Sequence, residues 1–221
     1  MIIKIRHILV TTFLSLSSVN FFSQGLYNNG ANIVFSGNAQ MYIDDITNGN
    51  YFTTGTGSIT ASATSTITLL KNWTNNSSNN GFATPDGGGV VLAGNAQTIG
   101  GSAATAFYNL SLTGNGIKTL AVNSTTVGGQ ATFTGVLSVG SSTLDLNGNR
   151  MDVTNSAVGA ITRSSGYIIS ETNTAVNPSI IRWYHRTVGG SKVYPFGVAG
   201  SYIPFTFNIT APMTDAAAYV D

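Results

Sequence analysis

Short apolar pairs separated by one polar residue recur along this chain, each followed by a Gly-Asn dipeptide. The pattern apolar-x-apolar-x-Gly-Asn occurs at residues 33–38, 90–95, 110–115 and 144–149. Because strand side chains alternate between two faces, Leu110 and Leu112 point one way while Ser111 and Thr113 point the other. Glycine and asparagine tolerate the positive φ angles of tight turns. The pattern therefore predicts short strands with one buried face, separated by sharp corners.

The spacing of the copies predicts a coiled sheet. The second and third copies start at Val90 and Leu110, and a weaker copy starts at Ala131. This indicates a repeat of roughly 20 residues per turn, in which each turn stacks on the one before. The step from Leu110 to Leu144 is too long to fit and indicates irregular corners. We expect four side chains to face a shared interior: Leu112, Leu120, Phe133 and Leu146.

The pattern of apolar residues changes after Asn155. The apolar runs become longer and more aromatic, and prolines interrupt them at positions 178, 195, 204 and 212. Proline confines a strand to a sheet edge or a strand start. We therefore predict solenoid repeats over residues 25–158, followed over residues 159–221 by a cap and an incomplete β-sandwich-like domain.

Composition supports an all-β fold. Hydrophobic residues make up 42% of the chain and charged residues only 8%. Few charges leave few i,i+4 ion pairs for helices, whereas Thr, Ser, Asn and Gly suit strands and turns. Disorder is the competing interpretation of such a polar composition, but the regular apolar positions argue against it.

The N-terminus has the three zones of a secretion signal. Lys4 and Arg6 precede the apolar run 8–16, and a polar break follows near Ser23. The apolar run is too short for a permanent membrane anchor. Residues 1–24 are therefore predicted to be a signal peptide, and the mature protein to be secreted or held on the outer cell surface with no membrane span.

Charge and cysteine content exclude several classes of protein. Of nine basic and eight acidic residues, only Lys4 and Arg6 lie in the predicted signal, so seven basic and eight acidic residues remain. A near-neutral chain gives no electrostatic case for binding nucleic acid. The chain has no cysteine, which excludes disulfides and thiol catalysis.

Several segments resemble, in order, the repeats of large secreted proteins of Bacteroidota. They are Asn72-Trp-Thr-Asn-Asn76, Gly89-Val-Val-Leu-Ala-Gly94, Ala96-Gln-Thr-Ile-Gly-Gly101, Phe107-Tyr-Asn-Leu-Ser-Leu112, Lys118-Thr-Leu120 and Thr143-Leu-Asp-Leu-Asn-Gly148. The resemblance covers roughly residues 67–153. It implies a right-handed parallel β-helix, exported as adhesin-like cargo of type IX secretion and truncated before any sorting domain. The family has no shared catalytic residues to transfer.

Two carboxylate groupings are the candidates for catalysis. Asp145 and Asp152 lie on predicted strands a corner apart and could reach the separation of about 5 to 10 Å that glycosidic chemistry needs. The alternative is that both are solvated side chains on an outward face, and we favour it. Asp44 and Asp45 form the second grouping. Neither has the alternating oxygen ligands of a calcium loop, so no metal site and no cofactor are predicted.

The segment Arg182-Trp-Tyr-His-Arg186 is the candidate for binding. Trp183 could be a stacking platform for an acidic sugar, with Arg182 and Arg186 as carboxylate clamps. On a strand, however, the two arginines share one face while Trp183 and His185 share the other. A lone histidine without a positioned serine nucleophile argues against an acyl-transfer triad.

These observations lead to two hypotheses of function. The first is a non-catalytic structural or adhesion module whose Thr- and Asn-rich solenoid face contacts polysaccharides or other cell-surface proteins. The second is a β-helix carbohydrate-active enzyme, either a polysaccharide lyase or a glycoside hydrolase. A groove in which two or more acidic side chains converge would favour the second.

Overall fold

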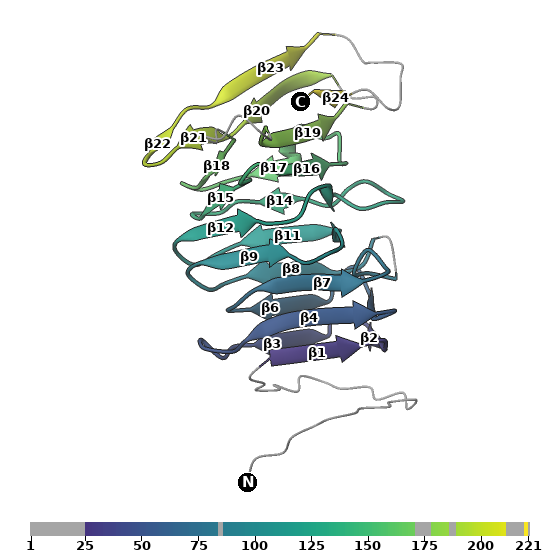
Figure 1. The fold of residues 1–221 in the computed structure, drawn as a ribbon. Helices are drawn as coiled ribbons and strands as arrows, with labels where there is room; N and C mark the ends of the chain where they lie inside the picture. The colour runs from purple at the N-terminus through teal and green to yellow at the C-terminus, as the bar shows by residue number, and fades with distance from the viewer. Residues whose placement is uncertain (1–24, 84–85, 171–177, 186–188, 211–218, 221) are drawn as a thin grey trace.

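The chain forms a parallel β-solenoid of about six turns, as the alternating pattern predicts. The computed structural model describes residues 25–83, 86–170, 178–185, 189–210 and 219–220, so the predicted signal peptide lies outside the described residues. Figure 1 shows the turns stacked along one axis, with β1 at one end and β23 at the other. Each turn runs through three walls, which we name A, B and C in chain order.

Walls A and C are continuous ladders in which every strand pairs in parallel with the next, up to β21 in wall A and β17 in wall C. Wall A contains β1 (Gly25–Asn29), β4 (Asn50–Gly55), β7 (Trp73–Ser77), β9 (Gln97–Gly100), β12 (Ile117–Leu120), β15 (Thr143–Asp145), β18 (Tyr167–Ile169) and β21 (Phe196–Val198). Wall C contains β3 (Gln40–Ile43), β6 (Thr66–Leu69), β8 (Gly89–Leu92), β11 (Asn109–Leu112), β14 (Leu137–Ser138) and β17 (Ile161–Thr162).

Wall B is interrupted. Its strands are β2 (Asn32–Phe35), β5 (Ser58–Ala61), β10 (Ala106–Phe107), β13 (Thr125–Val127), β16 (Arg150–Val153) and β19 (Ile180–Tyr184). Between β5 and β10 the pairing shrinks to a single parallel bridge from Ile59 to Phe82 and a hydrogen bond from the Ala106 N–H to the Asn80 carbonyl. The third turn therefore crosses wall B without a full strand.

The apolar positions of the pattern stack on one another in the interior. Val90 of β8 lies in register with Leu110 of β11, so the second and third motif copies occupy neighbouring turns of wall C. Leu112, Leu120 and Leu146 are fully buried, as predicted. The prediction for Phe133 is wrong, because this residue lies in a loop between β13 and β14 and is partly exposed.

The repeat is longer than predicted. Wall A strands from β1 to β18 begin at positions 25, 50, 73, 97, 117, 143 and 167, and the step from β9 to β12 is the shortest of these. The four motif copies also lie in different walls: the first in B, the second and third in C, and the fourth in A. The motif marks a corner of the coil in any wall, and corners differ in length.

Two glycines show that the corners need this residue for different reasons. Gly114 has a φ of 76°, in the region that favours glycine. Gly94 does not have a positive φ, but a Cβ atom there would lie 1.9 Å from the Leu70 carbonyl oxygen of the preceding turn. A larger residue would therefore separate two turns of the coil.

The interior also holds aromatic rings and two lysines. Trp73 stacks on Tyr51 at 4.2 Å between ring centroids, and its Nε1 donates to Thr105 Oγ1. The Lys118 side chain is fully buried, and its Nζ donates to two backbone carbonyls of the corner at residues 94–95. Lys192 is equally buried and donates to the Ser156 carbonyl. Burial lowers the pKa of each lysine to about 8.

The coil extends further than the predicted boundary at Val158. Parallel pairing continues through β17, β18, β19 and β21, so residues up to Val198 include further strands of the same solenoid. The aromatic segments that suggested a new domain therefore lie partly in its last turns.

Antiparallel strands occur at the C-terminal end. β20 (Gly190–Tyr194) pairs with β23 (Phe205–Ile209), β22 (Ser201–Tyr202) with β21, and β24 (Tyr219–Val220) with β19. In Figure 1, β20 and β23 lie across the last turns. We name β20 and β23 the C-terminal cap. The sandwich-like domain stays a prediction, and residues 211–218 lie outside the described part. No helix among the described residues has the length and apolar character to cross a membrane.

Candidate functional site

Asp145 and Asp152 lie in different walls and point away from a common site. Asp145 is flanked in wall A by the buried Leu144 and Leu146, so its side chain faces outward, where its Oδ1 accepts the Asn147 N–H at 2.8 Å. Asp152 lies in wall B, and its Oδ1 is 3.0 Å from Arg150 Nε. The two carboxylates are therefore not brought into one groove.

Asp44 and Asp45 lie at the corner after β3. The Asp45 Oδ1 accepts the N–H groups of Thr47 and Asn48 at 2.6 and 3.1 Å. The hydrogen bond from Thr47, followed by that from Asn48, lowers the pKa of Asp45. This carboxylate stabilises a turn, and within the described residues no group of three or more His, Asp or Glu side chains could hold a metal ion.

Trp183 is not a surface platform, which corrects the predicted acidic-sugar patch. Its side chain is fully buried, and its Nε1 donates to the Asn155 carbonyl at 2.8 Å. The alternation of β19 places Arg182 on the outer face instead, in register with Asp152. Arg186 lies outside the described residues. The patch therefore lacks the aromatic surface on which the hypothesis depended.

His185 lies inside the C-terminal cap. It is 1% exposed, and its ring lies between Trp183 and Phe207 at centroid distances of 6.4 and 5.9 Å. Burial, with a smaller contribution from the charge of Lys192, lowers the pKa of His185 to about 4. This histidine is therefore a neutral core residue at ordinary pH.

Many asparagines hold neighbouring turns together. Their side-chain oxygens accept backbone N–H groups of the next turn in the pairs Asn50–Asn72, Asn72–Thr98, Asn76–Ser102, Asn109–Val136 and Asn123–Arg150. Such bonds satisfy backbone donors at the corners, where the strand ladder ends. The asparagines of the predicted Thr- and Asn-rich face are thus partly structural.

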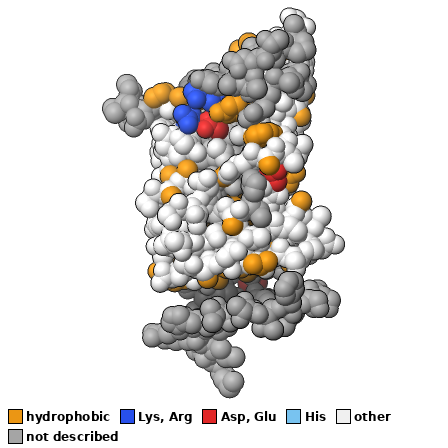
Figure 2. All heavy atoms as spheres, turned by 90° about the vertical axis from the view of Figure 1, so that its right-hand side faces the viewer, with side chains coloured by type: hydrophobic (Ala, Val, Ile, Leu, Met, Phe, Trp, Pro, Cys, Tyr) orange, Lys and Arg blue, Asp and Glu red, His pale blue; other side chains and the backbone are white. Residues whose placement is uncertain are grey.

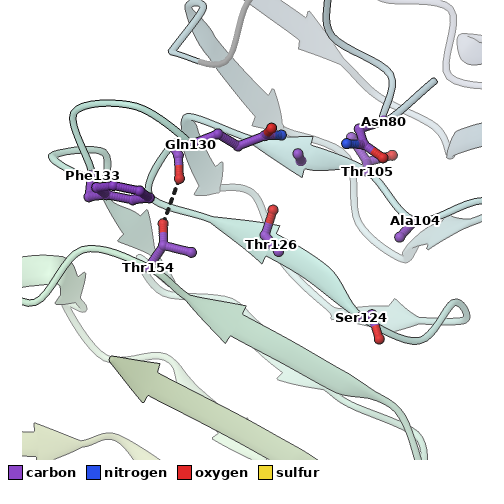
Figure 3. Close-up of a pocket in the computed structure, with 10 residues that line it drawn as sticks. Asn80, Ala104, Thr105, Ser124, Thr126, Gln130, Phe133 and Thr154 are labelled. Atoms are coloured by element: carbon purple, nitrogen blue, oxygen red, sulfur yellow. Dashed lines mark hydrogen bonds between the residues drawn. The ribbon is translucent and has the colours of Figure 1, made fainter. Parts of the chain in front are cut away.

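A groove lies on the outer face of wall B, where that wall is irregular. Its volume is about 300 Å³. Figure 3 shows Thr126 of β13 in the middle, Phe133 on one side, and Asn80, Thr105, Ala104 and Ser124 toward the other. The complete lining is Asn80, Ala104, Thr105, Ala106, Ser124, Thr126, Gly129, Gln130, Phe133 and Thr154. None of these ten residues is ionisable.

The loop of residues 128–136 forms one side of the groove and is anchored by Asp86. The Asp86 carboxylate accepts the N–H groups of Gln130, Ala131 and Thr132 at 3.0, 3.2 and 2.7 Å. Partial burial raises the pKa of Asp86, but these hydrogen bonds outweigh it and leave the pKa below the usual value. The carboxylate therefore fixes the start of the loop.

Further hydrogen bonds fix the loop from the next turn. Thr154 Oγ1 donates to the Gly129 carbonyl at 2.8 Å, the dashed line in Figure 3. Asn155 Nδ2 donates to the Gly135 carbonyl, also at 2.8 Å. Between these anchors Phe133 has a φ of 53°, a conformation rare for a bulky residue. The sequence analysis did not predict this loop. A signal for it was present, because glycines stand near both of its ends, at Gly128, Gly129 and Gly135.

The charged residues of wall B lie beside the groove and not in it. Arg150 pairs with Asp152 and donates from Nη2 to Ser124 Oγ at 3.0 Å. In Figure 2 basic and acidic side chains gather near the C-terminal end of the visible face, and most of the described surface below them is uncharged. The groove thus presents hydroxyl, amide and aromatic groups.

The comparisons with known proteins add no family to this description. No protein-family model, no curated protein and no solved structure matches the chain.

Proposed function

We propose that this protein is a non-catalytic, secreted or cell-surface module that binds polysaccharides or other surface proteins through the outer faces of its solenoid. The observation that carries the proposal is the chemistry of those faces. Their outward positions are rich in threonine, serine and asparagine, and the two candidate catalytic carboxylates lie in separate walls. A long, rigid, weakly charged surface suits contact with an extended neutral partner.

The N-terminal signal pattern and the resemblance to exported Bacteroidota solenoids support this location. A chain without cysteine is compatible with any redox compartment. Its stability depends on side-chain packing and on the hydrogen bonds of the strand ladders, because no disulfide can form. Adhesion at the cell surface is the role we assign to such a module.

The test combines a binding assay with an activity assay. The purified chain is run by affinity electrophoresis through gels that contain neutral or acidic polysaccharides, and the same polysaccharides are assayed for new reducing ends and unsaturated products. We expect retardation by at least one polysaccharide and no product. Product formation that Asp145→Asn or Asp152→Asn abolishes would overturn the proposal in favour of a lyase or hydrolase.

A further inference from the structure

The groove on wall B has the composition of a site for an uncharged ligand. Four hydroxyl side chains line it, from Thr105, Ser124, Thr126 and Thr154, together with the amides of Asn80 and Gln130. Three of these hydroxyls also bond within the protein: Thr105 accepts from Trp73, Ser124 accepts from Arg150, and Thr154 donates to the Gly129 carbonyl. Hydroxyl and amide groups both donate and accept hydrogen bonds, so they match the hydroxyl groups of a sugar. Ligand sites typically combine a few such polar groups with apolar and aromatic lining.

Phe133 supplies the aromatic part of this lining. Its ring lies at one side of the groove, beside Thr154 (Figure 3). The C–H face of a pyranose ring is apolar and can stack on an aromatic ring, while its hydroxyl groups point sideways to polar partners. The groove offers both kinds of contact within about 300 Å³, the lower end of the range for ligand sites.

The backbone of Phe133 has a φ of 53°, which its surroundings impose. A bulky residue with positive φ is strained, and such residues persist only where their surroundings impose them. Here the surroundings are the three N–H bonds to Asp86 and the bonds from Thr154 and Asn155. A preformed loop loses little conformational entropy when a ligand binds.

The charges near the groove argue against an acidic sugar. Arg150 is paired with Asp152, and Arg182 lies in register with the same aspartate. None of the three belongs to the groove lining. A carboxylated sugar would therefore meet no cation among the described lining residues, whereas a neutral sugar needs none.

We propose that this groove binds one or two residues of a neutral polysaccharide, with a sugar ring stacked on Phe133 and hydroxyl groups bonded to Gln130, Thr126 and Asn80. The proposal deepens the proposed function and rests on it, since it names the site and the class of glycan. The rest of the glycan extends beyond the groove at its open side.

Phe133→Gly separates a binding role from a structural one. Glycine adopts a positive φ without strain, which offsets the loss of the half-buried ring, so this variant should stay folded, and thermal unfolding checks this. The full chain and its variants are compared by affinity electrophoresis and calorimetry against cellulose derivatives, β-1,3-glucan, mannan and starch, with polygalacturonate and alginate as acidic counterparts. We expect Phe133→Gly to bind the preferred neutral glycan about tenfold more weakly or worse, and Phe133→Trp to retain binding.

Tyr27→Ala is the matched control. Tyr27 is an aromatic residue of β1 that is 64% exposed. It belongs to the first turn, whereas the groove lining begins at Asn80, so its loss should leave the affinity for the glycan unchanged. Gln130→Ala should weaken binding severalfold, because it removes one amide from the lining.

Three results would overturn the groove proposal: no binding of any neutral glycan by the wild type, preference for the acidic glycans, or equal binding by wild type and Phe133→Gly. In the last two cases glycan binding elsewhere on the solenoid would leave the proposed function standing. Cleavage of a glycan would instead defeat the proposed function itself.

Discussion

Walls A and C differ from wall B in continuity, and the difference separates the part of the molecule that holds the fold from the part that offers a site. Walls A and C run as unbroken parallel ladders through the described turns. Wall B is reduced to one bridge at Phe82 and carries the long loop before β14. Where the ladder is complete, outward side chains of adjacent strands lie in register with one another. Where it is broken, side chains from different turns enclose a groove.

The largest loss of stability should come from a substitution in the core, beneath the regular walls A and C. Trp73→Ala removes a fully buried indole that stacks on Tyr51 and bonds Thr105. We expect the free energy of unfolding to fall by about 3–5 kcal/mol. Denaturant titration measures this loss, with Phe133→Ala as the control that should cost far less. Equal losses for the two variants would contradict the distinction between the core and the groove.

The second effect is a loss of stability in mild acid at the C-terminal end of wall B. The pKa of His185 is about 4 in the folded chain and near its usual 6.5 in the unfolded chain, so the unfolded chain binds the proton first as pH falls. The contribution of His185 to stability is therefore full above pH 6.5 and is lost as the pH falls toward 4, by at most about 1.4 kcal/mol per pH unit. His185→Phe should flatten this decline in unfolding titrations. A variant with the same pH profile as the wild type would refute the assignment.

A smaller effect should appear at the loop of wall B. Asp86→Ala removes the acceptor of three N–H groups and should cost about 1–2 kcal/mol, because hydrogen bonds to a charged group are stronger than neutral ones. Hydrogen exchange at Gln130, Ala131 and Thr132 should accelerate while the amides of β9 and β12 stay protected. Uniform acceleration in all walls would show that the loop and the ladders open together.

The smallest effect should come from the outer face of wall A. Thr119 lies in the middle of β12 between its register partners Thr98 and Asp145, and its side chain faces outward. Thr119→Val should change the free energy of unfolding by less than about 0.5 kcal/mol, because it is a surface change on an intact strand. Thermal unfolding measures it. A large loss would mean that the outward threonines stabilise the ladder themselves.

The sequence was sufficient to predict the strands and their buried faces. An alternation of period two requires that Leu110 and Leu112 share a face, and the coil buries that face. The sequence was not sufficient to predict the repeat length. A Gly-Asn corner has the same sequence in every wall, and the segments between corners vary in length. The predicted repeat matches the step from β9 to β12, which is the shortest in wall A from β1 to β18.

The groove could not be predicted for a different reason. Asp86 and Gln130 are 44 positions apart, and only the stacking of the turns brings them together. The positive φ of Phe133 is imposed by those distant contacts and leaves no mark in the pattern of apolar residues. Alternation did predict that Trp183 and Arg182 face opposite ways, but it did not decide which of them faced the interior.

The buried lysines have a consequence for following the molecule in solution. Lys118 and Lys192 are fully enclosed, while Lys71 is half-buried in the corner after β6. An acylating reagent specific for amines should therefore modify Lys71 in the native coil and reach the other two only when their turns open. Mass spectrometry of the labelled chain would then report the opening of the middle turns and of the C-terminal cap separately, without any engineered probe.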